Sequence, residues 1–228
     1  MTRGGDLATL AWPDLASLNE PCLLAVPVGS TEQHGPHLPL GTDTEIAVAL
    51  ARRLADRVPG VIVAPAVPYG SSGEHDGFEG TVSVGQEALE LFVVELCRSA
   101  SSFASGVAII SAHGGNAEPV ARAVALLRRE GRRVCAWSPG SADPRDSHAG
   151  HAETSVMLAL AAGGVRMDRV VAGDTRTLDE LMPSLRASGV LSVTPTGVLG
   201  DPTGASVDHG NALLDEWTRQ LELVVRQL

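Results

Sequence analysis

Histidine and carboxylate side chains gather where the predicted strands of this sequence end. Glu32 and His34 are two residues apart, so in an extended segment both point to the same side and can face one cation or two adjacent cations. Asp43 stands where the next helical pattern begins, and its carboxylate could cap that helix or bridge two metals. His113 follows a later predicted strand. These residue types together predict a metal site.

A further cluster lies in the segment DSHAGHAETS, which contains His148, His151 and Glu153. We expect these residues to span a loop and the first turn of a helix, where the helix dipole favours an anionic side chain or substrate. Four of the seven histidines in the chain therefore fall on the same predicted rim as the carboxylates.

Each candidate taken alone has a structural alternative. Asp43 could simply cap a helix, Glu32 could be a solvated loop residue, and His113 could be a core histidine. One metal site explains why all of them follow strands, so we favour the metal site. We predict a structural role for His37, place His209 on the surface, and leave the role of His151 open.

Three groups of residues are candidates for binding the substrate. The glycine-rich segment GSSGEHDGFEG follows the second predicted strand and mixes charges, an aromatic ring and flexible hinges. Backbone N–H groups after His113 could stabilise an oxyanion. A tryptophan at the end of the fourth predicted strand forms either the opposite wall of the pocket or a buried packing contact. The candidates are Glu74, His75, Phe78, Gly114, Gly115, Asn116 and Trp137.

Short apolar runs alternate with longer helical patterns, which predicts an α/β fold with parallel strands. The predicted strands span 22–28, 61–67, 106–112 and 133–137, and the predicted helices 43–58, 86–104, 117–130 and about 207–227. Segments 139–150 and 192–206 are rich in Gly, Pro, Ser and Asp, and we predict them to be loops within a single domain over 1–228. An open parallel sheet places its active-site crevice at the carboxyl ends of the strands.

Composition excludes several classes of function. The net charge of -10 argues against nucleic acid as a partner. All 17 basic residues are arginine, so a P-loop, a pyridoxal Schiff base and a Ser-Lys hydrolase are excluded. The 3 cysteines are widely spaced, and we see neither a signal peptide nor an apolar run long enough to cross a membrane. We expect a cytoplasmic protein.

Four segments resemble the signature segments of the creatininase superfamily in order and spacing, and the resemblance covers nearly the whole chain. They are VPVGSTEQHGPHLPLGTD, SAHGGN, HAGHAETS and GVLGDPTGAS. The resemblance implies a three-layer α/β/α fold with a mostly parallel central sheet. It also implies a hexamer or larger homo-oligomer and two divalent ions per subunit, such as Fe²⁺, Zn²⁺ or Mn²⁺.

Carried over by position, the resemblance implies that Glu32 and His113 bind one metal, that His34 binds the other, and that Asp43 bridges both. His148 matches the catalytic histidine of the family and would pass a proton to the departing amine.

The chain also departs from the family pattern. Creatininase proper has a glutamate where this chain has Gly115, and Ala112 replaces a common glycine. Our candidate for the missing ligand, and for a second catalytic residue, is Glu153. The lost glutamate argues against creatinine as the substrate.

Other segments indicate a peptide substrate. YGSSGEHDGFEGTVSVG, DPRDSHAGHAETSVM and LMPSLRASGV are similar to a branch of the family that acts on a modified precursor peptide. This similarity implies removal of a carboxyl-terminal Val-Tyr dipeptide during redox-cofactor biosynthesis. Hydrolysis of a small cyclic or formylated amide and a non-catalytic metal-binding scaffold are the alternatives.

Overall fold

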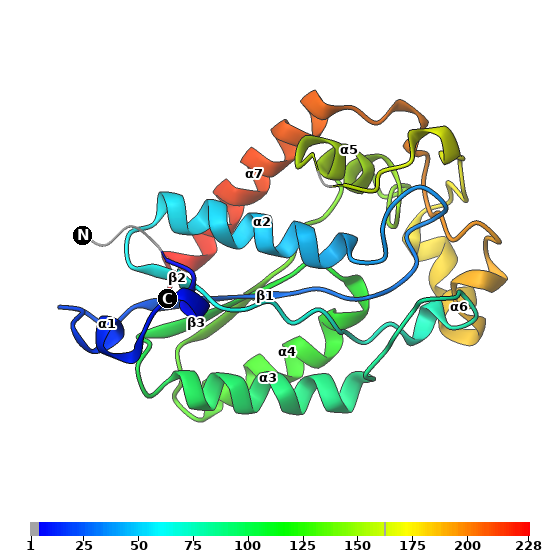
Figure 1. Ribbon diagram of the computed structural model, residues 1–228. Helices are drawn as coiled ribbons and strands as arrows, with labels where there is room; N and C mark the ends of the chain where they lie inside the picture. Colours follow the sequence, from blue (N-terminus) through cyan, green and yellow to red (C-terminus); the bar gives the residue numbers. More distant parts are fainter. Residues whose placement is uncertain (1–4, 162) are drawn as a thin grey trace.

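A parallel sheet forms the centre of the molecule. The computed structural model describes residues 5–161 and 163–228, and in these ranges the sheet has four strands in the order β2-β1-β3-β4 (Figure 1). They are β1 (Leu23–Val28), β2 (Val61–Val63), β3 (Gly106–Ser111) and β4 (Val134–Trp137). Each neighbouring pair is parallel, with Leu23 opposite both Val61 and Gly106. The carboxyl ends of all four strands therefore meet at one edge of the sheet.

Helices cover both faces of the sheet (Figure 1). One layer contains α2 (Thr42–Arg57), α5 (His151–Ala159) and α7 (Val207–Val225), and the other contains α3 (Gln86–Ala100) and α4 (Ala117–Arg129). The strands alternate their side chains between two apolar cores: Ala108 and Ile110 face the first layer, whereas Val107 and Ile109 face the second. The predicted three-layer α/β/α fold is confirmed.

Shorter helices lie outside these layers. The α-helices are α1 (Trp12–Ala16) and α6 (Leu178–Ser188). The 3-10 helices are η1 (Leu7–Thr9), η2 (Gly73–His75), η3 (Gly114–Asn116), η4 (Met167–Arg169), η5 (Val190–Ser192) and η6 (Pro202–Gly204).

Several elements differ from the sequence-based expectation: α3 ends at Ala100 instead of residue 104, and α1 was not predicted. β2 ends at Val63 instead of continuing to residue 67, because Pro65 has no N–H to donate; pairing resumes only at Val67, whose N–H bonds to the carbonyl oxygen of Pro27. Helix α6 was not predicted and contains Pro183. It begins with a capping box in which the Glu180 carboxylate accepts from the N–H of Thr177 at 2.8 Å.

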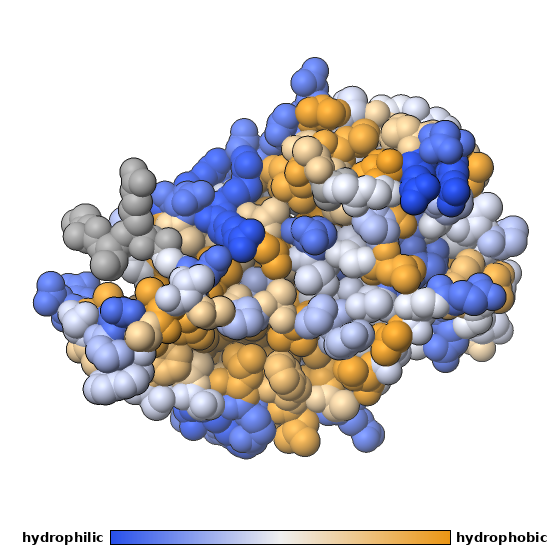
Figure 2. Space-filling model, viewed as in Figure 1, coloured by the Kyte–Doolittle hydropathy of each residue, from blue (hydrophilic) through white to orange (hydrophobic). Residues whose placement is uncertain are grey.

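The surface carries an apolar groove of about 640 Å³ beside α3. Its lining includes Tyr69, Phe92 and Phe103, all of which are exposed. Apolar side chains spread over the lower part of the face shown in Figure 2. Among the described residues, no helix combines the length and the apolar character that crossing a bilayer requires.

Candidate metal centre

The predicted ligands, distant in the sequence, come together at the carboxyl edge of the sheet. Glu32 and His34 lie in the segment that follows β1, and Asp43 is in the first turn of α2. His113 follows β3, and Glu153 is in the first turn of α5. Glu32 and His34 are fully buried, and Asp43 and His113 are at most 5% exposed. The reading of Glu32 as a solvated loop residue is therefore wrong.

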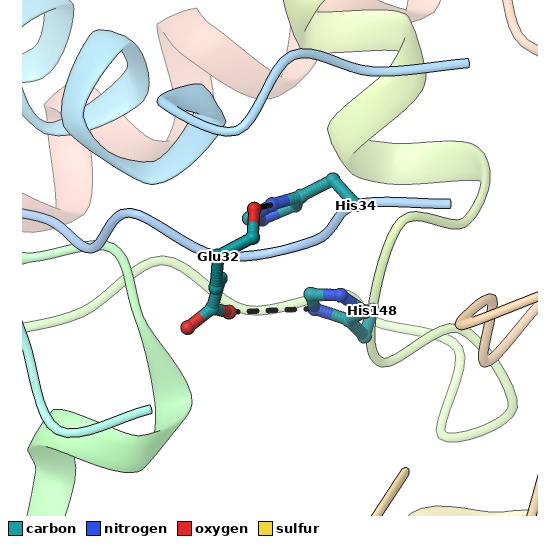
Figure 3. Close-up of side chains that lie close together, drawn as sticks. All are labelled: Glu32, His34 and His148. Carbon is teal, nitrogen blue, oxygen red and sulfur yellow. Dashed lines mark hydrogen bonds and ion pairs between the residues drawn. The ribbon is translucent and has the colours of Figure 1, made fainter. Parts of the chain in front are cut away.

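Ligand atoms of these side chains form three overlapping groups, and within each group the atoms lie within 4.8 Å of one another. The groups are Glu32, Asp43 and His113; His34, Asp43 and Glu153; and Glu32, His34 and His148. Asp43 belongs to two groups, because its Oδ1 lies 3.0 Å from Nε2 of His34 and its Oδ2 lies 3.4 Å from Nδ1 of His113. Figure 3 shows the third group, in which the Glu32 carboxylate and the His148 ring point toward one another.

In His34, His113 and His148, one ring nitrogen points toward the carboxylates and is called the inward nitrogen. The other, the outward nitrogen, forms a hydrogen bond with a backbone carbonyl. Nδ1 of His34 donates to the carbonyl oxygen of Glu32 at 3.1 Å, and Nε2 of His113 donates to that of Ser71 at 2.9 Å. Nε2 of His148 donates to the carbonyl oxygen of Gln33 at 2.9 Å. A carbonyl can only accept, so each outward nitrogen carries the hydrogen. The inward nitrogen of each ring is then free to bind a cation or a proton.

Two of the inward nitrogens face carboxylate oxygens at short range. Nε2 of His34 lies 3.0 Å from Oδ1 of Asp43, and Nδ1 of His113 lies 3.1 Å from Oε1 of Glu32. Two acceptors at such distances repel unless a positive charge lies between them. Neither carboxylate oxygen of Glu32 has a hydrogen-bond partner within the part of the chain that the structure describes, although both are buried. A buried carboxylate of this kind fits a divalent cation.

The pKa values agree with this arrangement. Burial lowers the pKa of His34 and of His113, but the neighbouring carboxylates outweigh burial and raise the two values to about 10 and about 9. Burial pushes the pKa of Asp43 up, but His34 and the hydroxyl of Ser30, which donates at 2.6 Å, hold it below its usual range. Without metal, protons therefore occupy the two imidazoles at the places where cations would bind.

Glu153 and His148 have different electrostatic surroundings. Burial raises the pKa of Glu153 to about 7, although its Oε2 accepts from the N–H of Ala149 at 2.6 Å. Burial also lowers the pKa of His148 well below its ordinary value, which keeps its imidazole neutral. Nδ1 of this neutral ring lies 4.0 Å from Oε1 of Glu32. His148 therefore turns a nitrogen that can accept a proton toward the centre.

Gly115, where creatininase proper has a glutamate, has no room for a side chain. A Cβ atom there would lie 2.2 Å from the carbonyl oxygen of Ser71 and 2.2 Å from Oε1 of Glu74. Oε1 of Glu74 in turn lies 3.4 Å from Nε2 of His113. Glu153 approaches His34 and Asp43 from α5 instead. This geometry supports Glu153 as the replacement ligand.

A pocket of about 380 Å³ adjoins the centre. His148, Glu153 and Gly114 line it, together with residues from the 139–147 loop and from the beginning of α6. The other predicted substrate-binding residues do not line this pocket. His75 is buried against Glu32, Phe78 and Trp137 are half-buried, and the Asn116 side chain bonds to the backbone of Ser71 and Gly29.

The histidines outside the centre are placed as follows. His37 is fully buried, and its Nε2 lies 2.9 Å from the hydroxyl of Thr154, which agrees with a structural role. His209 is exposed, as predicted, and its Nδ1 lies 2.9 Å from Nδ1 of His151. His151 also contacts the carbonyl oxygen of Gly204 at 3.0 Å, so the pair ties the loop before α7 to α5.

Two residues that organise the site were not predicted from the sequence. The Asp146 carboxylate accepts hydrogen bonds from the N–H groups of His151 and Ala152 at 2.7 and 2.9 Å. These N–H groups lie in the first turn of α5, the helix that carries Glu153, and have no partner within the helix. An aspartate shortly before a predicted helix was a usable signal for this cap. Gln33 contacts His75 and His148 through its side chain. Gln33 stands between the proposed ligands Glu32 and His34 in the sequence, and neither its residue type nor its spacing indicated these contacts.

Comparison with known proteins agrees with the fold. The chain is 51% identical over 199 residues to the mycofactocin precursor peptide peptidase of Mycolicibacterium smegmatis, covering 85% of this chain and 80% of the relative. A solved structure described as "Creatininase Mn" matches with a TM-score of 0.81 at 26% identity over 98% of both chains. A mutant creatininase of "Zn-Zn type" matches with a TM-score of 0.83 at 25% identity, over 99% of this chain and 98% of the other.

The family model "Creatinine amidohydrolase" matches residues 8–225, which include every proposed ligand. The chain therefore belongs to the creatininase family.

Proposed function

We propose that the protein is a metal-dependent hydrolase that cleaves an amide bond of a peptide. The observation that carries this proposal is the buried Glu32 carboxylate, which no described group hydrogen-bonds and which inward imidazole nitrogens surround. The ligand set is Glu32, His34, Asp43, His113 and Glu153. When bound there, two divalent cations such as Fe²⁺, Zn²⁺ or Mn²⁺ would lower the pKa of water and polarise the carbonyl of the amide.

The chain's own residues supply proton transfer and access to the substrate. His148 is neutral, faces the centre through Nδ1, and also lines the 380 Å³ pocket, so it can carry a proton between the centre and a leaving amine. Glu153, also a proposed ligand, lines the same pocket and is our second candidate for proton transfer. Gly114, at the rim of this pocket, can offer a backbone N–H to a developing oxyanion.

The relatives support a peptide as the substrate. The M. smegmatis protein and a relative from Mycobacterium ulcerans that is 46% identical over 93% of this chain are both named mycofactocin precursor peptide peptidase. We propose the same activity here, with release of a carboxyl-terminal Val-Tyr dipeptide from the modified precursor. Gly115 further separates this chain from creatininase proper. A homo-oligomer, a cytoplasmic location and a single domain are parts of the same proposal.

The test is incubation of metal-loaded protein with the modified precursor peptide, followed by mass spectrometry of the products. We expect the dipeptide from the modified peptide, none from the unmodified peptide, and none after exhaustive chelation. Creatinine and a formylated amide serve as competing substrates. Turnover of these small amides with no cleavage of the peptide would replace the proposal with the small-amide alternative, and no turnover of any substrate would favour a scaffold.

A further inference from the structure

The orientation of the Gln33 side-chain amide is fixed by two backbone groups. Its Oε1 accepts from the N–H of Gly35 at 2.8 Å, and its Nε2 donates to the carbonyl oxygen of Gly197 at 3.1 Å. A backbone N–H can only donate and a carbonyl can only accept, so the oxygen and nitrogen ends of the amide cannot be exchanged. The amide nitrogen of Gln33 is therefore a donor in its other contacts.

The second hydrogen of this amide goes to His75. Nε2 of Gln33 lies 2.9 Å from Nδ1 of His75 and 3.0 Å from Nε2 of His148. Nε2 of His148 already donates to the backbone carbonyl of Gln33 at 2.9 Å, so it carries a hydrogen and cannot accept another. Nδ1 of His75 is then the acceptor. A neutral His75 must carry its own hydrogen on Nε2.

The nitrogen that carries this hydrogen is close to the proposed ligand Glu32. Nε2 of His75 lies 3.3 Å from Oε1 of Glu32, a polar contact that is not aligned as a hydrogen bond, and His75 is only 3% exposed. In His34 and His113, the ring nitrogen near the carboxylates is the one whose lone pair can bind a cation once its proton is displaced. In neutral His75, the nitrogen near Glu32 carries the only ring hydrogen. An N–H cannot bind a cation, but it can hold a carboxylate that does so.

We propose that His75 is a positioning residue, held by Gln33 in the tautomer that places an N–H 3.3 Å from the Glu32 carboxylate, and not a third histidine ligand. This inference rests on the metal centre proposed above. The local backbone supports the contact. Gly197 has a φ of +77°, and a Cβ atom there would lie 1.9 Å from Oε1 of Gln33, so a larger residue would displace the amide.

The tautomer can be measured by NMR on protein labelled with ¹⁵N-histidine, without metal and loaded with Zn²⁺. We expect His75, assigned by the loss of its signals in His75→Gln, to show an unprotonated Nδ1 and a protonated Nε2 in both states. In Gln33→Glu the carboxylate can only accept, so the hydrogen should move to Nδ1. A protonated Nδ1 in the unmutated protein, or an Nε2 shift typical of a metal-bound nitrogen, would overturn the inference.

Metal affinity provides a second readout. Groups that hold metal ligands in place typically contribute about 10- to 100-fold in metal affinity, so His75→Leu should weaken Zn²⁺ binding by about that factor. His75→Gln keeps an N–H and should retain most of the affinity. Equal Zn²⁺ affinity in His75→Leu and the unmutated protein would overturn the inference. Thermal melting identifies a variant that has not folded, and in that case the spectrum of the unmutated protein decides.

Neither readout uses turnover. A protein that passes both but releases no dipeptide contradicts only the proposed activity, so failure of the activity and failure of the positioning role are distinguishable.

Discussion

Binding of cations to the metal-free protein should release protons. His34 and His113, with pKa values of about 10 and about 9, both carry a proton at about pH 8. A cation that binds between these imidazoles and the carboxylates displaces both protons. Glu153, with a pKa of about 7, is already mostly ionised at this pH and adds little. We therefore expect about two protons released from the imidazoles when the centre fills.

The magnitude follows from linkage. Each displaced proton makes the apparent affinity for the cation rise about tenfold per pH unit, and about 1.36 kcal/mol per unit is the corresponding free energy. Two protons give about 100-fold per unit, or about 2.7 kcal/mol, between about pH 7.5 and 8.5. The sign is fixed by the raised pKa values: the affinity increases as pH rises toward about 9 and then levels off as His113 and finally His34 lose their protons.

The assay is isothermal titration calorimetry of Zn²⁺ into chelator-treated protein, in buffers that differ in ionisation enthalpy. His34→Gln should release one proton fewer than the unmutated protein, whereas His209→Gln, at an exposed site outside the centre, should change nothing. Any proton lost from coordinated water is released in the unmutated protein and in both variants. The difference in proton release between the unmutated protein and His34→Gln therefore reports the proton of the His34 imidazole. Equal proton release from the His34 variant and the unmutated protein would refute the reasoning.

Three further predictions concern the site. His148→Ala should lower turnover by about a hundredfold to ten-thousandfold while metal content, measured by elemental analysis, stays unchanged; full activity with full metal would rule out its role. Glu153→Gln should bind one equivalent of metal tightly where the unmutated protein binds two, and an unchanged stoichiometry would exclude Glu153 as a ligand. Gly115→Glu should destabilise the fold by about 1–3 kcal/mol in denaturant titrations, because the carbonyl of Ser71 leaves no space; unaltered stability would contradict the clash.

The fold could be predicted because local pattern and global arrangement agree. Short apolar runs bounded by Gly, Ser and Pro are too short for helices and indicate buried parallel strands, and the helical patterns between them then cross over the sheet. The misplaced boundary of β2 reflects Pro65, which interrupts pairing inside an apolar run. Helix α6 was missed because Pro183 argues against a helix, whereas the capping box at Thr177 and Glu180 outweighs it locally.

The proposed ligands could be predicted for a topological reason. Residues after parallel strands meet at one edge of the sheet, so Glu32 and His113 become neighbours although 81 residues, the difference between their numbers, separate them. Gln33 could not be found in this way. In an extended segment its side chain points away from those of Glu32 and His34, and its partners His75 and Gly197 are 42 and 164 residues distant. Sequence spacing does not reveal such contacts.

The glycine at position 115 and the glutamate at position 153 belong to one arrangement. The loop that carries Ser71 and Glu74 packs so closely on Gly115 that no side chain fits at position 115. A carboxylate must then reach His34 and Asp43 from another element, and the first turn of α5 is suited to hold one because its N–H groups and dipole favour negative charge. We therefore propose that Glu153, at the beginning of α5 and in the lining of the pocket, replaces the ligand that Gly115 cannot supply. A Glu153 variant should consequently impair both metal binding and proton transfer, whereas a His148 variant should impair proton transfer alone.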